Sequence, residues 1–192
     1  MQKEYKINQV NPSKGALDFS YLLDAPAGKH GFVQAKNGHL YYEDGTRARF
    51  LGFNMATRSN AVNHELAEKL AGRFASLGVN VIRLHAADAP IGEQERSWSS
   101  CKEAPLLDYE KGTSRFFHPE GLDRFDYFVA KLKEKGIYIH IDLIVAREFL
   151  LGDELDYDTK VASCSKCYPM FNERLIELQP VSYTHSEPTR PY

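Results

Sequence analysis

The chain has little of several things that would narrow its function quickly. Its 192 residues include only three cysteines and one tryptophan. Three cysteines cannot complete a disulfide framework, which favours a reducing compartment, cytoplasmic by default. No window approaches the roughly 18 consecutive apolar residues of a membrane span, and residues 1–6 lack the apolar run of a signal peptide. We therefore expect no membrane partner.

An excess of charge of one sign is also missing. The formal net charge is −2, with acids and bases interspersed, so we expect no nucleic acid partner. The Cys164-Ser-Lys-Cys167 segment has the spacing of half a zinc site, but a structural zinc needs four ligands. The third cysteine is Cys101, and no histidines lie at a matching paired spacing. With no glycine-rich phosphate cradle either, we predict no metal and no cofactor.

What the sequence does contain is an alternation of strand-like and helix-like segments. We expect strands at 49–54, 79–85 and 137–145, and helices at about 64–77, 119–135 and 169–178. Strands joined through helices pair in parallel, and parallel strands are buried on both faces. The pattern predicts an α/β fold with a parallel sheet.

The first helix illustrates how these segments are bounded. Asn63 is a suitable N-cap and Gly78 a suitable stop. An apolar stripe at helical spacing predicts the buried face, formed by Leu66, Leu70, Phe74 and Leu77.

A hairpin precedes the parallel unit. Phe32–Lys36 and His39–Glu43 have strand composition and are separated by Asn37-Gly38, a two-residue turn signal. We expect this hairpin to cover one end of a barrel, with residues 1–30 as an N-terminal extension.

Polar side chains lie at the ends of the predicted strands, where parallel sheets place their chemistry. Asn54, Arg83 and His85 end the first two strands, and His140 and Asp142 alternate on one face of the third. Each is open to a structural interpretation: Asn54 could cap a turn, Arg83 could form a buried ion pair and His85 could be satisfied inside the loop. His140 and Asp142 could form a hydrogen-bonded pair in the barrel interior.

The long connection 86–118 exceeds the usual length of about 2–6 residues, which is typical of functional loops. Trp98 and Tyr109 in this loop could stack on a sugar ring or pack the loop onto the domain. Asp153 and Glu154, in a later loop, are expected to be solvated.

The order of these motifs resembles the amino-terminal part of cellulase-like glycoside hydrolases, the broad group that includes glycoside hydrolase family 5. The similarity covers about residues 18–179 and rests on the hairpin and on three strand motifs: Arg49-Phe-Leu-Gly-Phe-Asn54, Leu77-Gly-Val-Asn-Val-Ile-Arg-Leu-His85 and Lys135-Gly-Ile-Tyr-Ile-His-Ile-Asp-Leu143.

The resemblance implies the first three βα units of a partial TIM (β/α)8 barrel, preceded by an N-terminal β-hairpin. It implies retaining hydrolysis of a β-linked oligo- or polysaccharide by two glutamates. Those glutamates follow strands four and seven in the family, so we expect them beyond residue 179 and assign no catalytic residue here. The resemblance implies that Arg83 supports the nucleophilic carboxylate and keeps it ionised. Our candidate substrate-binding residues are Arg83, His85, Asn54, His140, Asp142 and Trp98. Ile144 stands where many members have a histidine.

Two other functions fit the same residues. The chain could be a non-catalytic carbohydrate-binding module that uses loop 86–118, or a barrel enzyme of other chemistry.

Residues 180–192 break the pattern at Pro180 and resemble the conceptual translation of a transposon-type sequencing adapter. We interpret 31–179 as the barrel portion and 180–192 as a non-native tail, the alternative being an ordinary polar terminus.

Overall fold

A computed structural model describes residues 18–89, 104–142, 145–153 and 173 of the chain. Several predictions fall outside these residues. They concern Trp98, the three cysteines, Ile144, Glu154, the tail at 180–192 and all but one residue of the third helix.

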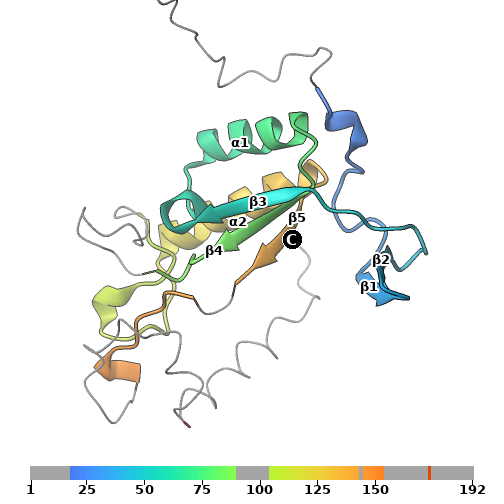
Figure 1. The fold of residues 1–192 in the computed structure, drawn as a ribbon. Coiled ribbons are helices and arrows are strands. Elements are labelled where there is room, and N and C mark those ends of the chain that lie inside the picture. Colours follow the sequence, from blue (N-terminus) through green and yellow to red (C-terminus); the bar gives the residue numbers. More distant parts are fainter. Residues whose placement is uncertain (1–17, 90–103, 143–144, 154–172, 174–192) are drawn as a thin grey trace, which may run out of the picture.

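Three parallel strands form the centre of the fold (Figure 1). They are β3 (Gly52–Ala56), β4 (Val81–His85) and β5 (Tyr138–Ile141), in the order β3-β4-β5. Asn54 pairs with Arg83, and Arg83 pairs with His140, so these three polar residues form a row across the sheet. The predicted α/β class and parallel sheet are confirmed.

Two helices cover the sheet on one face (Figure 1). Helix α1 (His64–Ser76) begins where the Asn63 side chain accepts a hydrogen bond from the Leu66 amide, as predicted, and Gly78 follows its end at φ 74°. Helix α2 (Pro119–Glu134) has proline in its first turn. Short 3-10 helices lie at Ser20–Leu22 (η1), Thr57–Asn60 (η2), Tyr109–Lys111 (η3) and Leu151–Asp153 (η4).

The core lies between the helices and the sheet. Its fully buried side chains include Ile82 and Leu84 of β4 and Phe128 and Leu132 of α2. Each fully buried side chain of this size contributes about 1.5–3 kcal/mol through removal of apolar surface from water.

The predicted buried face of α1 is partly wrong. Leu66 and Leu77 are 43% and 44% exposed, whereas Ala67, Ala71 and Ala75 are buried with Phe74. Small alanines let α1 approach the sheet and α2 closely, so the contact face is centred on them rather than on the larger leucines. A pattern that ranks residues by hydrophobicity alone gives the leucines too much weight.

The prediction that the strands are buried on both faces is also wrong for the outer strands. β3 is exposed at Phe53 (41%) and β5 at Ile141 (43%). Both strands pair only with β4 in the part of the chain that the structure describes, so Phe53 and Ile141, which pair with Ile82 and Leu84 on the helix-covered face, lie at the open edges of that face. Asn54 and His140 are exposed on the other face, over which no helix lies among the described residues. β5 is also shorter than the predicted strand 137–145.

The predicted hairpin is present as β1 (Val33–Lys36) and β2 (His39–Tyr42). Asn37 and Gly38 both have positive φ, 51° and 73°, as a two-residue type I′ turn requires. The Tyr42 ring stacks on Tyr138 at the start of β5, and Phe50 meets both rings edge-on. The hairpin therefore lies at the amino end of the parallel strands (Figure 1).

His30 joins the segment before the hairpin to the turn after it. Its Nδ1 lies 2.5 Å from Asp44 Oδ2, and its Nε2 contacts Asp24, which also pairs with Lys29. The hydrogen bonds to Asp24 and Asp44 raise the pKa of His30, and those from Lys29 and His30 lower the pKa of Asp24.

Two helical glycines provide a test of the packing. A Cβ at Gly121 would lie 1.9 Å from the Pro105 carbonyl oxygen, whereas a Cβ at Gly72 would meet nothing within 4 Å. We expect Gly72→Ala to stabilise the protein by about 0.5–1 kcal/mol, through helix propensity. Gly121→Ala should destabilise it by about 1–3 kcal/mol, because the loop before α2 must move. Urea unfolding of both variants measures this, and shifts of the same sign would contradict the packing of α2.

The ion pairs of His30 predict a pH dependence. A histidine whose pKa is raised by folding contributes stability that is complete below its ordinary pKa of about 6.5 and is lost as pH rises through the raised value. Urea midpoints should therefore fall over that window in the wild-type chain, and less so in His30→Gln. If the urea midpoint of His30→Gln fell with pH as steeply as that of the wild-type chain, this would show that His30 does not anchor the hairpin.

Candidate functional site

Three charged or polar side chains meet at the carboxyl ends of β4 and β5. Asp142 receives a side-on pair of hydrogen bonds from Arg83, with Nε 3.1 Å from Oδ1 and Nη2 2.7 Å from Oδ2. The Nδ1 atom of His85 lies 2.5 Å from the same Oδ2 atom. An ionised carboxylate can only accept hydrogen bonds. The Nδ1 atom of His85 therefore carries a proton and donates the hydrogen bond to Asp142.

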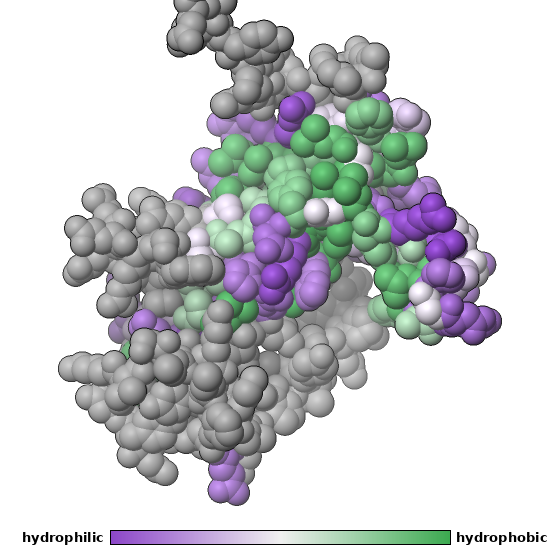
Figure 2. All heavy atoms as spheres, viewed as in Figure 1, coloured by the Kyte–Doolittle hydropathy of each residue, from purple (hydrophilic) through white to green (hydrophobic). Residues whose placement is uncertain are grey.

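Strand geometry explains why these residues meet. Side chains alternate across a strand, so Arg83 and His85 share one face of β4 while Leu84 between them is buried against the helices. Asp142 follows β5 directly, and its amide donates to the Leu84 carbonyl, which continues the register of the sheet. A parallel neighbour therefore brings Asp142 to the same face. Over the sheet, Figure 2 shows hydrophilic side chains bordered by hydrophobic ones.

The charges of this cluster balance in favour of an ionised Asp142. Partial burial raises the pKa of this carboxyl, but the hydrogen bonds from His85 and Arg83 outweigh it and hold the pKa below the ordinary value of 3.8. Asp142 is 13% exposed and Arg83 is 39% exposed, so the carboxylate is sheltered while the guanidinium reaches solvent.

The two remaining polar residues of the row, His140 and Asn54, are more exposed and make fewer contacts with the cluster. His140 is 67% exposed, with Nε2 3.7 Å from Asp142 Oδ1. Asn54 is exposed on β3, next to Arg83. It does not cap the turn that leaves β3: the Ser59 hydroxyl does so, bonding both the amide and the carbonyl of Ala56. The turn-capping interpretation of Asn54 is therefore wrong.

The residues that follow β3 and β4 both have an unusual backbone conformation. Thr57 after β3 and Ala86 after β4 each have φ 52°, a left-handed conformation that non-glycine residues rarely adopt. The buried Asn60 side chain donates to the His85 carbonyl at 2.8 Å and so ties the first turn to the end of β4. Strain of this kind gathers where the surrounding structure holds functional side chains in place.

Asp88 is a structural residue that sequence patterns did not indicate. Its buried carboxylate accepts hydrogen bonds from the amides of Val145, Ala146 and Arg147, at 2.8, 3.1 and 3.2 Å. The loop after β4 thereby fixes the loop after β5, a few residues beyond Asp142. The only sequence signal for this role is an aspartate shortly after a predicted strand, and aspartates are common in loops of every kind.

A second buried carboxylate organises the same loops. Asp153 is 1% exposed and accepts from the Thr113 hydroxyl at 2.6 Å and from the Ser114 and Leu150 amides. Arg147 donates to the hydroxyl and the carbonyl of Ser114. The prediction that Asp153 is solvated is wrong, because loop amides take the place of water around it.

Tyr109 packs its loop onto the domain rather than presenting a free ring. Its hydroxyl donates to the Asp88 carbonyl at 2.8 Å and accepts from the Glu148 amide at 3.2 Å. Burial raises the pKa of this phenol. Of the two proposed stacking residues, Tyr109 thus has a structural role, and Trp98 lies outside the described residues.

Two classes of site are not seen in the described segments. No group of three or more His, Cys, Asp or Glu side chains there is placed to hold a metal ion. Among those segments, no helix has the length and apolar character needed to cross a bilayer. Glu148 and the exposed Glu173 are described but lie outside the Arg83 cluster.

The cluster can bind and orient a polar or anionic group. Arg83 uses Nε and Nη2 for Asp142, and its Nη1 makes no hydrogen bond to any residue that the structure describes. A guanidinium fixed on one edge by a carboxylate presents its other edge in a defined direction.

Comparison with known proteins gives a likeness in fold only. No protein-family profile matches the chain, and no curated protein sequence does. The structure is similar to the endo-1,4-beta-mannanase from Rhizomucor miehei, with a TM-score of 0.53 at 14% identity, over 81% of this chain and 41% of that one. It is also similar to a glycoside hydrolase family 5 structure from Bacteroides vulgatus ATCC 8482, with a TM-score of 0.43 at 16% identity, over 62% and 26%.

The chain therefore has a cellulase-like fold of the kind found in glycoside hydrolases. It spans roughly a quarter to two fifths of the length of the solved structures that it matches.

The site predicts a measurable cost for removing the Asp142 charge. Asp142→Asn should destabilise the protein by about 1–3 kcal/mol at neutral pH, because Arg83 and His85 lose a charged acceptor. Because folding lowers the pKa of Asp142, this contribution is present above pH 3.8 and lost as pH falls through the lowered value.

Urea unfolding at neutral pH and at about pH 2 measures both effects. The control is Asp123→Asn, whose exposed pair with His64 should be worth less than about 0.5 kcal/mol. An Asp142 variant as stable as this control would contradict the cluster.

Proposed function

We propose that this chain is the N-terminal part of a (β/α)8-barrel glycoside hydrolase, with residues 31–179 in the barrel domain. The intact enzyme hydrolyses O-glycosidic bonds of a β-linked glycan with retention, using two glutamates that lie beyond residue 179. The mannanase-like fold and the polar row at the strand ends both support this proposal.

The observation that carries the proposal is the orientation of Arg83. Its guanidinium is fixed by Asp142 on one edge and is 39% exposed. A carboxylate on a later strand of a barrel could take the other edge. A guanidinium in that place keeps a nucleophilic carboxylate ionised, because the nearby positive charge favours the charged form.

The other polar residues of this face have roles in substrate binding under the proposal. Exposed Asn54 and His140 can hydrogen-bond sugar hydroxyls, and His85 lines the site between β4 and the loops. Asp142 acts through Arg83 and His85 as a positioning residue. Trp98 stays a prediction for sugar stacking.

The test is the gene beyond codon 179 and the enzyme that it encodes. We expect an apolar strand followed by Asn-Glu, and a protein that releases sugar from a β-mannan or β-glucan with retained anomeric configuration, followed by NMR. Arg83→Lys should lower kcat/KM by roughly 100-fold, about 2.7 kcal/mol, because the fork geometry is lost. The 192-residue chain alone should release no sugar.

Two results would replace the proposal. Glycan binding without turnover by the extended protein would favour a carbohydrate-binding module. Hydrolysis by the 192-residue chain alone would show that the catalytic carboxylates are among its own residues.

A further inference from the structure

The outward side of the hairpin carries a basic groove at the opposite end of the sheet from Arg83. The groove has a volume of about 460 Å³ and is lined by the hairpin turn and by residues 47–49. Its basic side chains are Lys36, His39, Arg47 and Arg49, Asn37 adds a neutral amide, and no acidic residue lines it.

Strand pairing explains why these side chains gather. Lys36 pairs directly with His39 across the hairpin, and Arg47 bridges to Tyr41 on the other edge of β2. Because directly paired side chains share a face, Lys36, His39, Tyr41 and Arg47 point to one side. Tyr42 lies on the opposite face, where it stacks on Tyr138. The apolar face thus attaches the hairpin to the domain, and the basic face is left outward.

The cations of the groove are not neutralised by the described part of the protein. Neither Lys36 nor Arg47 nor Arg49 forms an ion pair with a described residue, whereas Lys29, Lys69, Arg124 and Lys131 do. Arg47 Nη2 lies 3.0 Å from His39 Nδ1. A guanidinium can only donate hydrogen bonds, so His39 Nδ1 accepts this one. The imidazole proton is therefore on Nε2, which provides a further hydrogen-bond donor.

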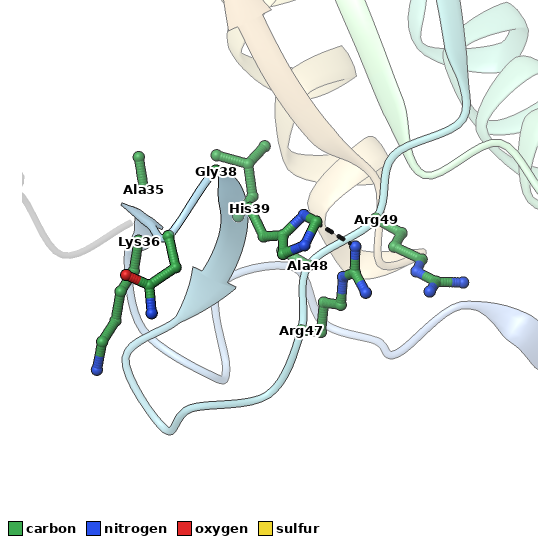
Figure 3. A pocket seen from close by; sticks show the side chains of 9 residues that line it. Ala35, Lys36, Gly38, His39, Arg47, Ala48 and Arg49 are labelled. Carbon is green, nitrogen blue, oxygen red and sulfur yellow. Dashed lines mark hydrogen bonds between the residues drawn. The ribbon is translucent and has the colours of Figure 1, made fainter.

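The arrangement of the charges favours an extended ligand over a single small anion. Figure 3 shows His39 and Arg47 facing each other, while Lys36 and Arg49 extend away on either side. Cations spread in this way match repeated negative charges along a chain better than one phosphate or sulfate ion. The groove offers three permanent charges, so the counterion release that dominates nucleic acid affinity would be small here.

We propose that this groove, Lys36-His39-Arg47-Arg49, binds an acidic segment of a polysaccharide through its carboxylate or sulfate groups. The choice of a glycan rests on the proposed function, whereas the negative charge of the ligand is argued from the groove alone. Tyr41 points to the same side as Lys36 and His39, and an aromatic ring beside cations suits the apolar face of a sugar ring. The site would hold the polymer away from the catalytic end.

The test measures binding of the 192-residue chain to five probes by affinity electrophoresis and calorimetry. The probes are polygalacturonate, dextran sulfate, neutral β-1,4-mannan, a single-stranded oligonucleotide and inorganic sulfate. We expect polygalacturonate or dextran sulfate to bind, with an affinity that falls as salt rises, and the stronger of the two distinguishes carboxylate from sulfate. Tighter binding of the oligonucleotide or of free sulfate would overturn the proposal.

Matched variants locate the binding. The double variant Lys36→Gln, Arg47→Gln should weaken polyanion binding at least about tenfold, equivalent to 1.4 kcal/mol. Lys133→Gln, an exposed lysine on α2, should change it less than about twofold. Equal losses in both would show unspecific charge attraction and overturn the site. Melting curves confirm that the variants stay folded.

Arg83→Gln separates this inference from the proposed function. It should leave polyanion binding unchanged, because Arg83 is at the other end of the sheet. Loss of polyanion binding in this variant would place the ligand at the strand ends and overturn the groove. Polyanion binding by the hairpin together with an inactive extended protein would contradict the proposed function alone.

Discussion

The structure depends on one constraint, the burial of a parallel sheet on a single face. Two helices cover the side of β4 that bears Ile82 and Leu84, and alternation then sends Arg83 and His85 to the other side. A shift of one residue in register would bury the guanidinium under α2 and expose the leucine. Core packing and site chemistry therefore cannot be varied independently along β4.

The elements with strong local signals could be predicted from sequence. Asn63, Gly78 and the Asn37-Gly38 turn have side-chain or backbone requirements that involve only a few neighbouring residues. The order of strands and helices, and the face that His140 and Asp142 share, could also be predicted from local sequence patterns. The fold class and its likeness to glycoside hydrolases follow from these local features in sequence.

What could not be predicted depends on contacts distant in sequence. Leu66 lies on the predicted stripe, but the packing distance between α1 and α2 is set by Ala67 and Ala71. Asp88 and Asp153 look like ordinary loop acids until the loops that donate to them are placed. The pairing of Arg83 with Asp142, 59 residues apart, needed the register of β5 against β4.

Three carboxylates at the carboxyl end of the sheet have two different physical roles. Asp88 and Asp153 are buried and accept mainly backbone amides, so their charges are satisfied by loop structure. Asp142 instead accepts from two side chains and leaves one edge of Arg83 without a described partner. Among the described residues this cluster has a fixed cation and no second carboxylate, and the outward edge of Arg83 can receive one. That asymmetry is the physical reason why the proposed function expects catalytic carboxylates on later strands of a barrel.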